Sequence, residues 1–287
     1  MQTAERLASL ELALTPQVGA MSFLKLLQTF STVTAVWSAS STQLQSIISS
    51  KAISAISTHQ GQEALQAALT WETQHSDNHL LCLVDDDYPI SLSEIYAPPP
   101  ILFARGDINL LQQPSVALIG SRHATASGLH ISQDLATELS RYGICLVSGF
   151  AAGIDTAAHQ GCVQVQGNTI AVLGTGIARV YPASNRDLAH QISQTGLLLS
   201  EFPLGTAPIA HNFPRRNRII AGLSQAIVVV EATLESGSLI TARLGLEMNK
   251  EVMAVPGSIH NPHSKGCHAL IKQGAKLVES VNDILEE

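Results

Sequence analysis

The sequence predicts an α/β protein with a doubly wound, mostly parallel sheet of the Rossmann-like type, preceded by a small all-helical domain. Two observations lead to this fold class. From residue 80 onward, short apolar runs alternate with stretches of helical periodicity, and strands that are apolar throughout belong to parallel sheets covered by helices on both faces. Before residue 78, apolar residues keep helical spacing and show no strand-like alternation. We therefore expect a helical domain at 1–78 and an α/β domain at 79–287.

The helical part begins with Leu7, Leu10 and Leu14 on one face, followed by a Pro- and Gly-containing breaker at 15–19. Residues 61–75 predict one longer helix. The strands of the α/β part are expected at 80–84, 101–104, 116–120, 144–148, 169–173, 197–201, 226–230 and 251–255, with helices such as 127–142 and 236–249 between them. In such a sheet, ligands bind at the carboxyl ends of the strands.

Composition limits the possible functions. Hydrophobic residues make up 45% of the 287 residues and charged residues only 14%, which indicates a sizeable core and excludes a charge-extended, disordered chain. The formal net charge of −7 argues against a nucleic-acid binder that relies on overall positive charge. A local basic cluster on an acidic body can still bind phosphates. Whether the protein can bind nucleic acid therefore depends on where its lysines and arginines lie.

The cysteines indicate a reducing compartment. They are Cys82, Cys145, Cys162 and Cys267, and no two of them form a C-x-x-C pair. Reduced structural thiols in a cytoplasmic protein are the expected reading. The N-terminus shows no signal peptide, and no apolar stretch approaches the ~18 residues needed to span a membrane.

Two loops at strand ends predict phosphate binding. Gly120, Ser121 and Arg122 follow the strand at 116–120, where glycine allows close backbone approach to an anion and arginine supplies a two-pronged donor. Ser236, Gly237 and Ser238 follow the strand at 226–230 and open a helix with hydroxyls and free N–H groups. The alternatives are an ordinary strand-to-helix turn for the first loop and a well-capped helix for the second.

Two other loops carry weaker signals. The loop with Gly149 and Gly153 leads into Asp155 and His159, which share a helix face and could form an acid–base pair or part of a metal site. No third ligand has matching spacing, so a structural pair is favoured. The sequence at 174–179 resembles half of a dinucleotide fingerprint, but the third glycine is missing and no clear ribose-binding acid follows, so no nicotinamide cofactor is expected.

The densest positive segment of the sequence reads Phe213, Pro214, Arg215, Arg216, Asn217 and Arg218. A phenylalanine beside arginines at the ligand edge of a sheet suits a base stacked on a ring with phosphates held nearby, and stacking contributes ~1–3 kcal/mol per base whatever the base. A solvated run of charges is the alternative.

Motifs for catalysis and metal binding are not found. The sequence has no G-x-S-x-G, H-E-x-x-H or Walker A motif, and no nucleophile has a visible base. The histidines His260, His263 and His268 could bind a metal, but surface loop positions are favoured. We therefore expect no enzyme activity, no metal and no cofactor.

Taken together, these motifs resemble the DprA/Smf family. The resemblance runs in order from Tyr88-Pro89 to Ala275 and includes Tyr181-Pro182 and Pro256-Gly257 besides the loops above. It implies an extended Rossmann fold, homodimers, and a cytoplasmic protein without established catalytic activity. It also implies a single-stranded DNA-binding protein that protects incoming strands in natural transformation and helps to load the RecA recombinase. The N-terminal helices resemble the sterile-alpha-motif or helix-hairpin-helix-like domain common in that family.

The motif segments and the resemblance together give the expected DNA-binding residues. They are Gly120, Ser121, Arg122, Gly149, Phe213, Pro214, Arg215, Arg216, Asn217, Arg218, Ser236, Gly237 and Ser238.

The sequence departs from the family pattern in four places. Many members carry a lysine just before Phe-Pro, where this sequence has Ala210-His211-Asn212, which predicts weaker or more pH-sensitive binding. Phe150 stands where leucine is usual, which predicts a packing role, and His268 stands where asparagine is common. Many members also continue into a C-terminal winged helix, which this sequence, ending at Glu287, does not include.

Two other functions are less well supported by the sequence. A nucleotide phosphoribohydrolase on a related Rossmann-like fold would carry a P-G-G-x-G-T-x-x-E loop, but Pro256-Gly257 is followed by Ser258-Ile259-His260, so the loop and its acid are missing. Release of free base from AMP would favour that enzyme. A protein-interaction scaffold would bind no nucleic acid at all.

Overall fold

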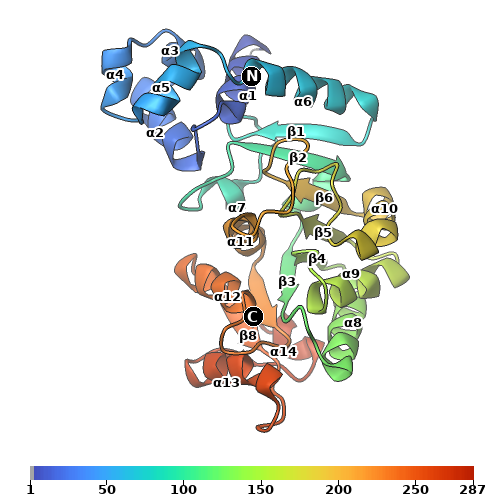
Figure 1. Ribbon diagram of the computed structural model, residues 1–287. Coiled ribbons are helices and arrows are strands. Elements are labelled where there is room, and N and C mark those ends of the chain that lie inside the picture. The colour runs from blue at the N-terminus through green and yellow to red at the C-terminus, as the bar shows by residue number, and fades with distance from the viewer. Residues whose placement is uncertain (1–2) are drawn as a thin grey trace.

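The computed structural model describes residues 3–287, with a group of N-terminal helices at one end of a long central sheet (Figure 1). The N-terminal helices are α1 (Thr3–Leu14), α2 (Ala20–Phe30), α3 (Val33–Trp37), α4 (Ser41–Gln45), α5 (Ser50–Ser57) and α6 (Gln62–Gln74). The later helices are α7 (Ile90–Ser93), α8 (Ala126–Arg141), α9 (Ile154–Gln164), α10 (Arg186–Thr195), α11 (Asn212–Leu223), α12 (Ser238–Glu247), α13 (Lys265–Lys272) and α14 (Val281–Leu285). Short 3-10 helices lie at Ile108–Gln112, Ala183–Asn185 and Pro262–Ser264.

Between residues 3 and 287, nine strands form one sheet in the order β1-β2-β6-β5-β4-β3-β7-β8-β9. They are β1 (Asn78–Cys82), β2 (Ile101–Gly106), β3 (Ser115–Ile119), β4 (Cys145–Ser148), β5 (Thr169–Val172), β6 (Leu197–Ser200), β7 (Ala226–Val229), β8 (Glu251–Ala254) and β9 (Lys276–Leu277). β2 pairs antiparallel with β1 and β6, and the pairs from β6 to β9 are parallel. The predicted α/β class with a mostly parallel sheet is confirmed. The sequence missed β9, because two residues are too few to show a period.

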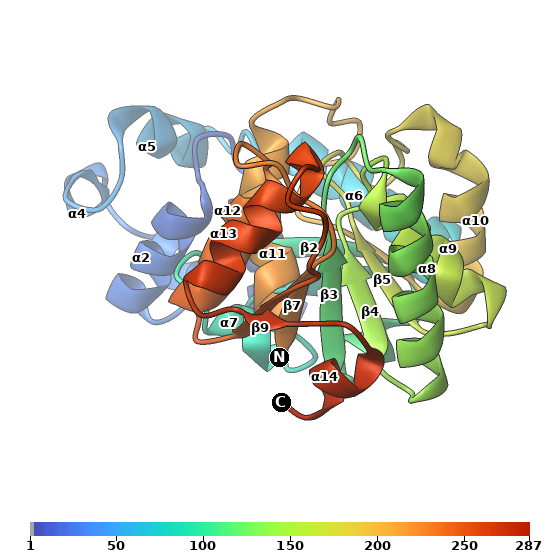
Figure 2. The same cartoon turned by 90° about the horizontal axis from the view of Figure 1, so that it is seen from below.

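Side chains that alternate along β3 explain why both faces of the sheet are covered. Val116 and Leu118 share a buried cluster with Leu135 of α8, whereas Ala117 and Ile119 share the opposite cluster with helices α11 and α12. A strand that buries both sets of side chains needs helices on both sides. Figure 2 shows α8, α9 and α10 on one side of the sheet and α11, α12 and α13 on the other.

The sheet changes direction between β3 and β7. From β3 the chain moves outward through β4, β5 and β6, and it returns to place β7 on the other side of β3. The loop after β3 therefore leads to α8 on one face and the loop after β7 leads to α12 on the other. Such a switch point opens a crevice at the carboxyl ends of the strands, which is where ligands bind in open α/β sheets.

The N-terminal helices share a core with one end of the sheet. Leu10 and Trp71 from these helices belong to the same buried cluster as Leu80 of β1 and Phe103 of β2. Across this junction, Arg6 donates to the Leu80 carbonyl at 2.9 Å. The helix expected at 61–75 is confirmed as α6, whereas the division into two domains after residue 78 stays a prediction. No helix within 3–287 combines the length and the apolar character that a membrane crossing requires.

Candidate functional site

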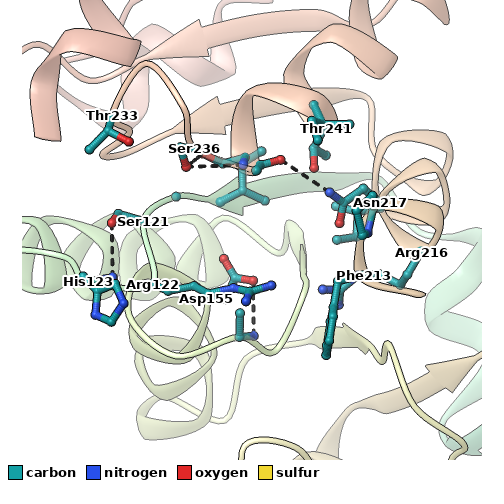
Figure 3. Close-up of a pocket in the computed structure, with 18 of the residues that line it drawn as sticks. Ser121, Arg122, His123, Asp155, Phe213, Arg216, Asn217, Thr233, Ser236 and Thr241 are labelled. Atoms are coloured by element: carbon teal, nitrogen blue, oxygen red, sulfur yellow. Dashed lines mark hydrogen bonds between the residues drawn. The ribbon is translucent and has the colours of Figure 1, made fainter. Parts of the chain in front are cut away.

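A cavity of about 430 Å³ opens at the switch point. It lies between the loop after β3, the first turn of α11 and the first turn of α12 (Figure 3). Most of the residues expected from the sequence line it, namely Gly120, Ser121, Arg122, Phe213, Pro214, Arg216, Asn217, Ser236, Gly237 and Ser238. Segments far apart in the chain thus meet at one sheet edge. Gly149, Arg215 and Arg218 lie outside its lining.

The loop after β3 is fixed by Glu231, a buried residue two positions after the end of β7. The Ser121 N–H donates to the Glu231 carbonyl at 2.7 Å. The Thr125 N–H and hydroxyl donate to the two Glu231 carboxylate oxygens at 2.9 and 2.6 Å. Thr125 in turn caps α8 through the Gly128 N–H at 3.0 Å. Sequence reasoning assigned Glu231 no role, because nothing in the local pattern shows that it faces a loop more than 100 residues earlier.

Glycine is required where this carboxylate lies against α8. A Cβ on Gly128 would come within 2.4 Å of the Glu231 Cδ, a separation that real Cβ atoms do not tolerate. The helix and the carboxylate can therefore pack closely only with glycine at this position. The loop that carries Arg122 follows β3 and is in this way anchored to Glu231, which follows the neighbouring strand β7.

Arg122 and Phe213 present adjacent flat groups at the cavity. The Arg122 guanidinium carbon lies 5.1 Å from the centroid of the Phe213 ring, within the range of a cation–π contact. Gly174 backs the ring, since a Cβ there would lie 2.6 Å from Phe213 Cδ1. Tyr181 stands beside it with ring centroids 5.7 Å apart. The ring is thus held in place, while Arg122 remains exposed.

Arg216 lies beneath the cavity and not on its open face. It is 3% exposed, and its Nη1 donates to the carbonyls of Gly149 and Val172. Burial lowers its pKa to about 10, partly opposed by the nearby Asp155 carboxylate. Burial raises the pKa of Asp155, and Arg216 opposes that rise. Only Nη1 has hydrogen-bond partners in the described part of the protein, and the buried Nε has none. A direct phosphate contact by Arg216 stays a prediction.

Gly149 provides space for this buried pair. A Cβ at that position would lie 2.7 Å from an Asp155 carboxylate oxygen and 2.8 Å from Arg216 Nη2. Its place in the structure is therefore under the site, next to the pair, and outside the cavity lining.

The other two arginines of the basic segment face away from the cavity. Glu201, which directly follows β6, has a side chain only 2% exposed and accepts from Arg218 at 2.7 Å and from Arg215 at 3.3 Å. The segment is helical from Asn212 onward, and successive residues of a helix point about 100° apart. The single positive patch expected from the sequence is therefore divided into a buried arginine and an ion-paired couple.

The first turn of α12 lies at the place where the sequence predicts an anion cradle. Gly237 is the residue before the helix, and Ser238 opens it. The hydroxyls of Ser236 and Ser238 lie 2.7 Å apart, and the Asn217 amide approaches the Gly237 carbonyl at 3.5 Å. Figure 3 shows Ser236 and Thr241 across the cavity from Arg122, Asp155 and Phe213. A helix N-terminus carries partial positive charge, so this wall favours an anion.

Asp155 and His159 have separate hydrogen-bond partners, the Ala151 N–H for Asp155 and the Thr169 hydroxyl for His159. His159 is fully buried and its Nδ1 lies 2.8 Å from the Thr169 hydroxyl. Burial, and then the Arg216 charge, lower its pKa to about 3, so the imidazole is neutral. Phe150 is buried 5.7 Å from the His159 ring, which confirms its packing role. Across residues 3–287 no three potential ligands gather to hold a metal ion.

The histidines around the cavity were only partly foreseen. His123 and His263 both line it, and the His263 Nδ1 lies 3.5 Å from the Ser121 hydroxyl. His268 instead holds the carbonyl of Gly257 at 3.0 Å. At the place of the missing lysine, His211 is exposed at the start of α11. Its effect on binding stays a prediction.

Comparison with known families gives one clear match. The family model described as DNA recombination-mediator protein A matches residues 79–287. DNA processing protein DprA of Streptococcus pneumoniae is 47% identical over 209 residues, which are 71% of this chain and 72% of that relative. Protein Smf of Escherichia coli K12 is 44% identical over 225 residues, 78% of this chain and 60% of that relative.

Two solved structures share the fold. The crystal structure of DprA from Streptococcus pneumoniae superposes with a TM-score of 0.85 at 38% identity and covers 96% of this chain and 95% of that one. DNA processing protein A from Helicobacter pylori, whose structure gives insights into a unique single-stranded DNA binding mode, has a TM-score of 0.66 at 30% identity. That match covers 73% of this chain and 94% of the other. The first match extends beyond residues 79–287 into the N-terminal helices.

Proposed function

This chain belongs to the DNA recombination-mediator protein A family, and from that premise we propose that it binds single-stranded DNA in the cavity at the switch point. The protein would protect incoming strands during natural transformation and help to load the RecA recombinase, acting as a homodimer in the cytoplasm. The Helicobacter pylori relative, described for its single-stranded DNA binding, and the family's description as a recombination mediator support this proposal.

The convergence of three features in one cavity carries the proposal. Arg122 and the ring of Phe213 form adjoining flat surfaces suited to a base and its phosphate. The first turn of α12 offers hydroxyls and N–H groups for an anion. The single carboxylic acid in the described lining, Asp155, is buried next to Arg216. A protein of net charge −7 can in this way offer a locally positive site.

The residues proposed to contact DNA directly lie in the cavity lining, whereas the buried Arg216, which also lines it, is proposed to act indirectly. Arg122 binds phosphate, Phe213 stacks on a base, and Asn217 with Ser236, Gly237 and Ser238 holds the backbone. Gly120, Ser121 and Pro214 shape the walls, as their place in the lining supports. Arg216 with Gly149, and Arg215 with Arg218, act by holding α11 in position.

The cavity geometry favours a binding protein over an enzyme. The closest approach of a hydroxyl to an imidazole in the described lining is Ser121 to His263, at 3.5 Å, longer than the ~2.6–3.2 Å of a nucleophile and its base. The Ser121 hydroxyl already accepts from the His123 N–H at 3.1 Å. The alternative function, a nucleotide phosphoribohydrolase, would release free base from AMP.

A titration of single-stranded and duplex oligonucleotides at two salt concentrations tests the proposal. We expect oligo-dT to bind more tightly than a duplex of equal length, since base stacking needs unpaired bases. The logarithm of the affinity should fall with the logarithm of salt concentration by ~0.7 for each phosphate contact. Equal affinity for both forms, or no binding of either, would contradict the proposal, and release of adenine from AMP would favour the enzyme.

A further inference from the structure

A second cavity, of about 400 Å³, lies on the other side of the Arg122 loop. It is bounded by the N-terminal parts of α8 and α9, which run side by side on one face of the sheet (Figure 2). Arg122 and His123 line both cavities. The loop at 121–123 is therefore a ridge between two adjacent hollows. No motif in the sequence indicates this second cavity.

The walls of the second cavity are firmly packed. The Ser132 hydroxyl of α8 donates to the Ile154 carbonyl at 3.0 Å, and the Thr137 hydroxyl donates to the Gly161 carbonyl at 3.1 Å. A Cβ on Gly161 would lie 2.4 Å from the Gln133 carbonyl oxygen, so the two helices are in backbone contact. The cavity walls are therefore rigid, and binding of a ligand does not require them to become ordered.

The lining has the chemistry of a nucleobase site. Ala124, Leu129 and Ala157 provide apolar surface. Gln133 and Gln160 provide side-chain amides, each able to donate and accept hydrogen bonds at a base edge. The hydrogen bonds described around this cavity use hydroxyl groups and engage neither amide. Within the described residues no carboxylate lines it, so nothing there repels a phosphate.

The ridge between the two cavities is a single loop packed against the start of α9. Gly153 has a φ of +81°, and a Cβ on it would lie 2.2 Å from the Ser121 carbonyl oxygen. The loop that enters α9 is thus in direct backbone contact with the loop that carries Arg122. A phosphate over this ridge would meet the exposed Arg122 guanidinium, with one cavity on either side.

We propose that the second cavity holds the base of the nucleotide next to the one in the first cavity, with Gln160 and Gln133 hydrogen-bonding its edge and Arg122 binding the phosphate between them. The inference rests on the proposed single-stranded DNA binding. It also defines the path of the bound strand, which runs from Phe213 over Arg122 toward α8 and α9.

Competition by short 5′-phosphorylated thymidine oligomers against labelled oligo-dT tests it. For the parent protein, lengthening the competitor from one to two nucleotides should raise affinity about tenfold, within the range for one added stacked or hydrogen-bonded base. A dinucleotide that lacks one of its two bases should not show this tenfold gain in affinity. In Gln160→Ala and Gln160→Leu, which remove the amide without adding a charge, the gain from one to two nucleotides should shrink to about twofold or less, while mononucleotide affinity stays within about twofold of the parent. Because Gln160 is exposed, neither variant should change the melting temperature.

The matched control is Gln164→Ala, an exposed glutamine at the end of α9 and outside the lining of either cavity, which should keep the full gain from one to two nucleotides. If both Gln160 variants also keep that gain, or if Gln164→Ala loses it equally, the second base does not lie in the second cavity and the inference is wrong. If the parent binds no thymidine oligomer of any length, the proposed function itself fails. The two failures are therefore distinguishable.

Discussion

Replacing Arg122 with alanine is expected to weaken binding of oligo-dT by about ten- to hundredfold, the loss typical of a charge-assisted hydrogen bond to a phosphate. Arg122 is exposed, lines both cavities and lies over the Phe213 ring. The slope of log affinity against log salt should also fall by ~0.7, because one phosphate contact is lost. Fluorescence anisotropy at several salt concentrations gives both quantities.

Arg141→Ala is the matched control for this prediction. Arg141 is exposed at the last turn of α8, outside the lining of either cavity, so its removal changes the net charge equally. We expect an affinity within about twofold of the parent, as for exposed charges away from the contact. Equal losses in the two variants would show that Arg122 acts only through overall charge.

Replacing Arg216 with alanine is expected to lower the free energy of unfolding by about 3–5 kcal/mol, because it removes the cation near the buried Asp155 and the donor to two buried carbonyls. The Asp155 carboxylate would lose the arginine that faces it, and the carbonyls of Gly149 and Val172 would lose their donor. A domain has about 5–15 kcal/mol of stability in total. This variant should therefore unfold at a much lower urea concentration than the parent. Urea unfolding measures the difference.

The stability of Arg216→Ala should depend on pH in a definite direction. Burial already raises the pKa of Asp155 above its ordinary value of 3.8, and without Arg216 it should rise further. The folded state then binds a proton that the unfolded state has released, so stability is greatest below the ordinary pKa and is lost as pH rises through the folded-state pKa. Unfolding between about pH 4 and about pH 7 should show this loss. Asp155→Asn combined with Arg216→Met should remove the dependence and recover part of the stability, and an unchanged pH profile would contradict the pairing.

The sequence predicted the sheet well because buried parallel strands carry an unmistakable pattern. Each expected strand overlaps an observed one, and the loops at Gly120 and Ser236 meet in one cavity. The carboxyl ends of parallel strands all lie at the same edge of the sheet. The loops that follow them can therefore be predicted to lie near one another even when the strand order is unknown.

Side-chain direction could not be predicted in the same way. Three arginines within four residues look like one patch in a linear sequence, but on α11 one is buried under the cavity and two bind Glu201. The role of Glu231 and the second cavity depends on contacts between segments distant in the chain. The periodicity of apolar residues indicates which residues of one helix or strand are buried. It does not indicate which distant segments those residues contact.

Ultraviolet cross-linking of oligo-dT to the protein, followed by mass spectrometry of the peptides, tests most directly that a strand lies in this cavity. We expect adducts on the peptide with Phe213 and on the peptide with Arg122, competed away by unlabelled oligo-dT and reduced in Arg122→Ala. Adducts confined to the N-terminal helices at 3–74, or to the far end of the sheet near β9, would contradict it.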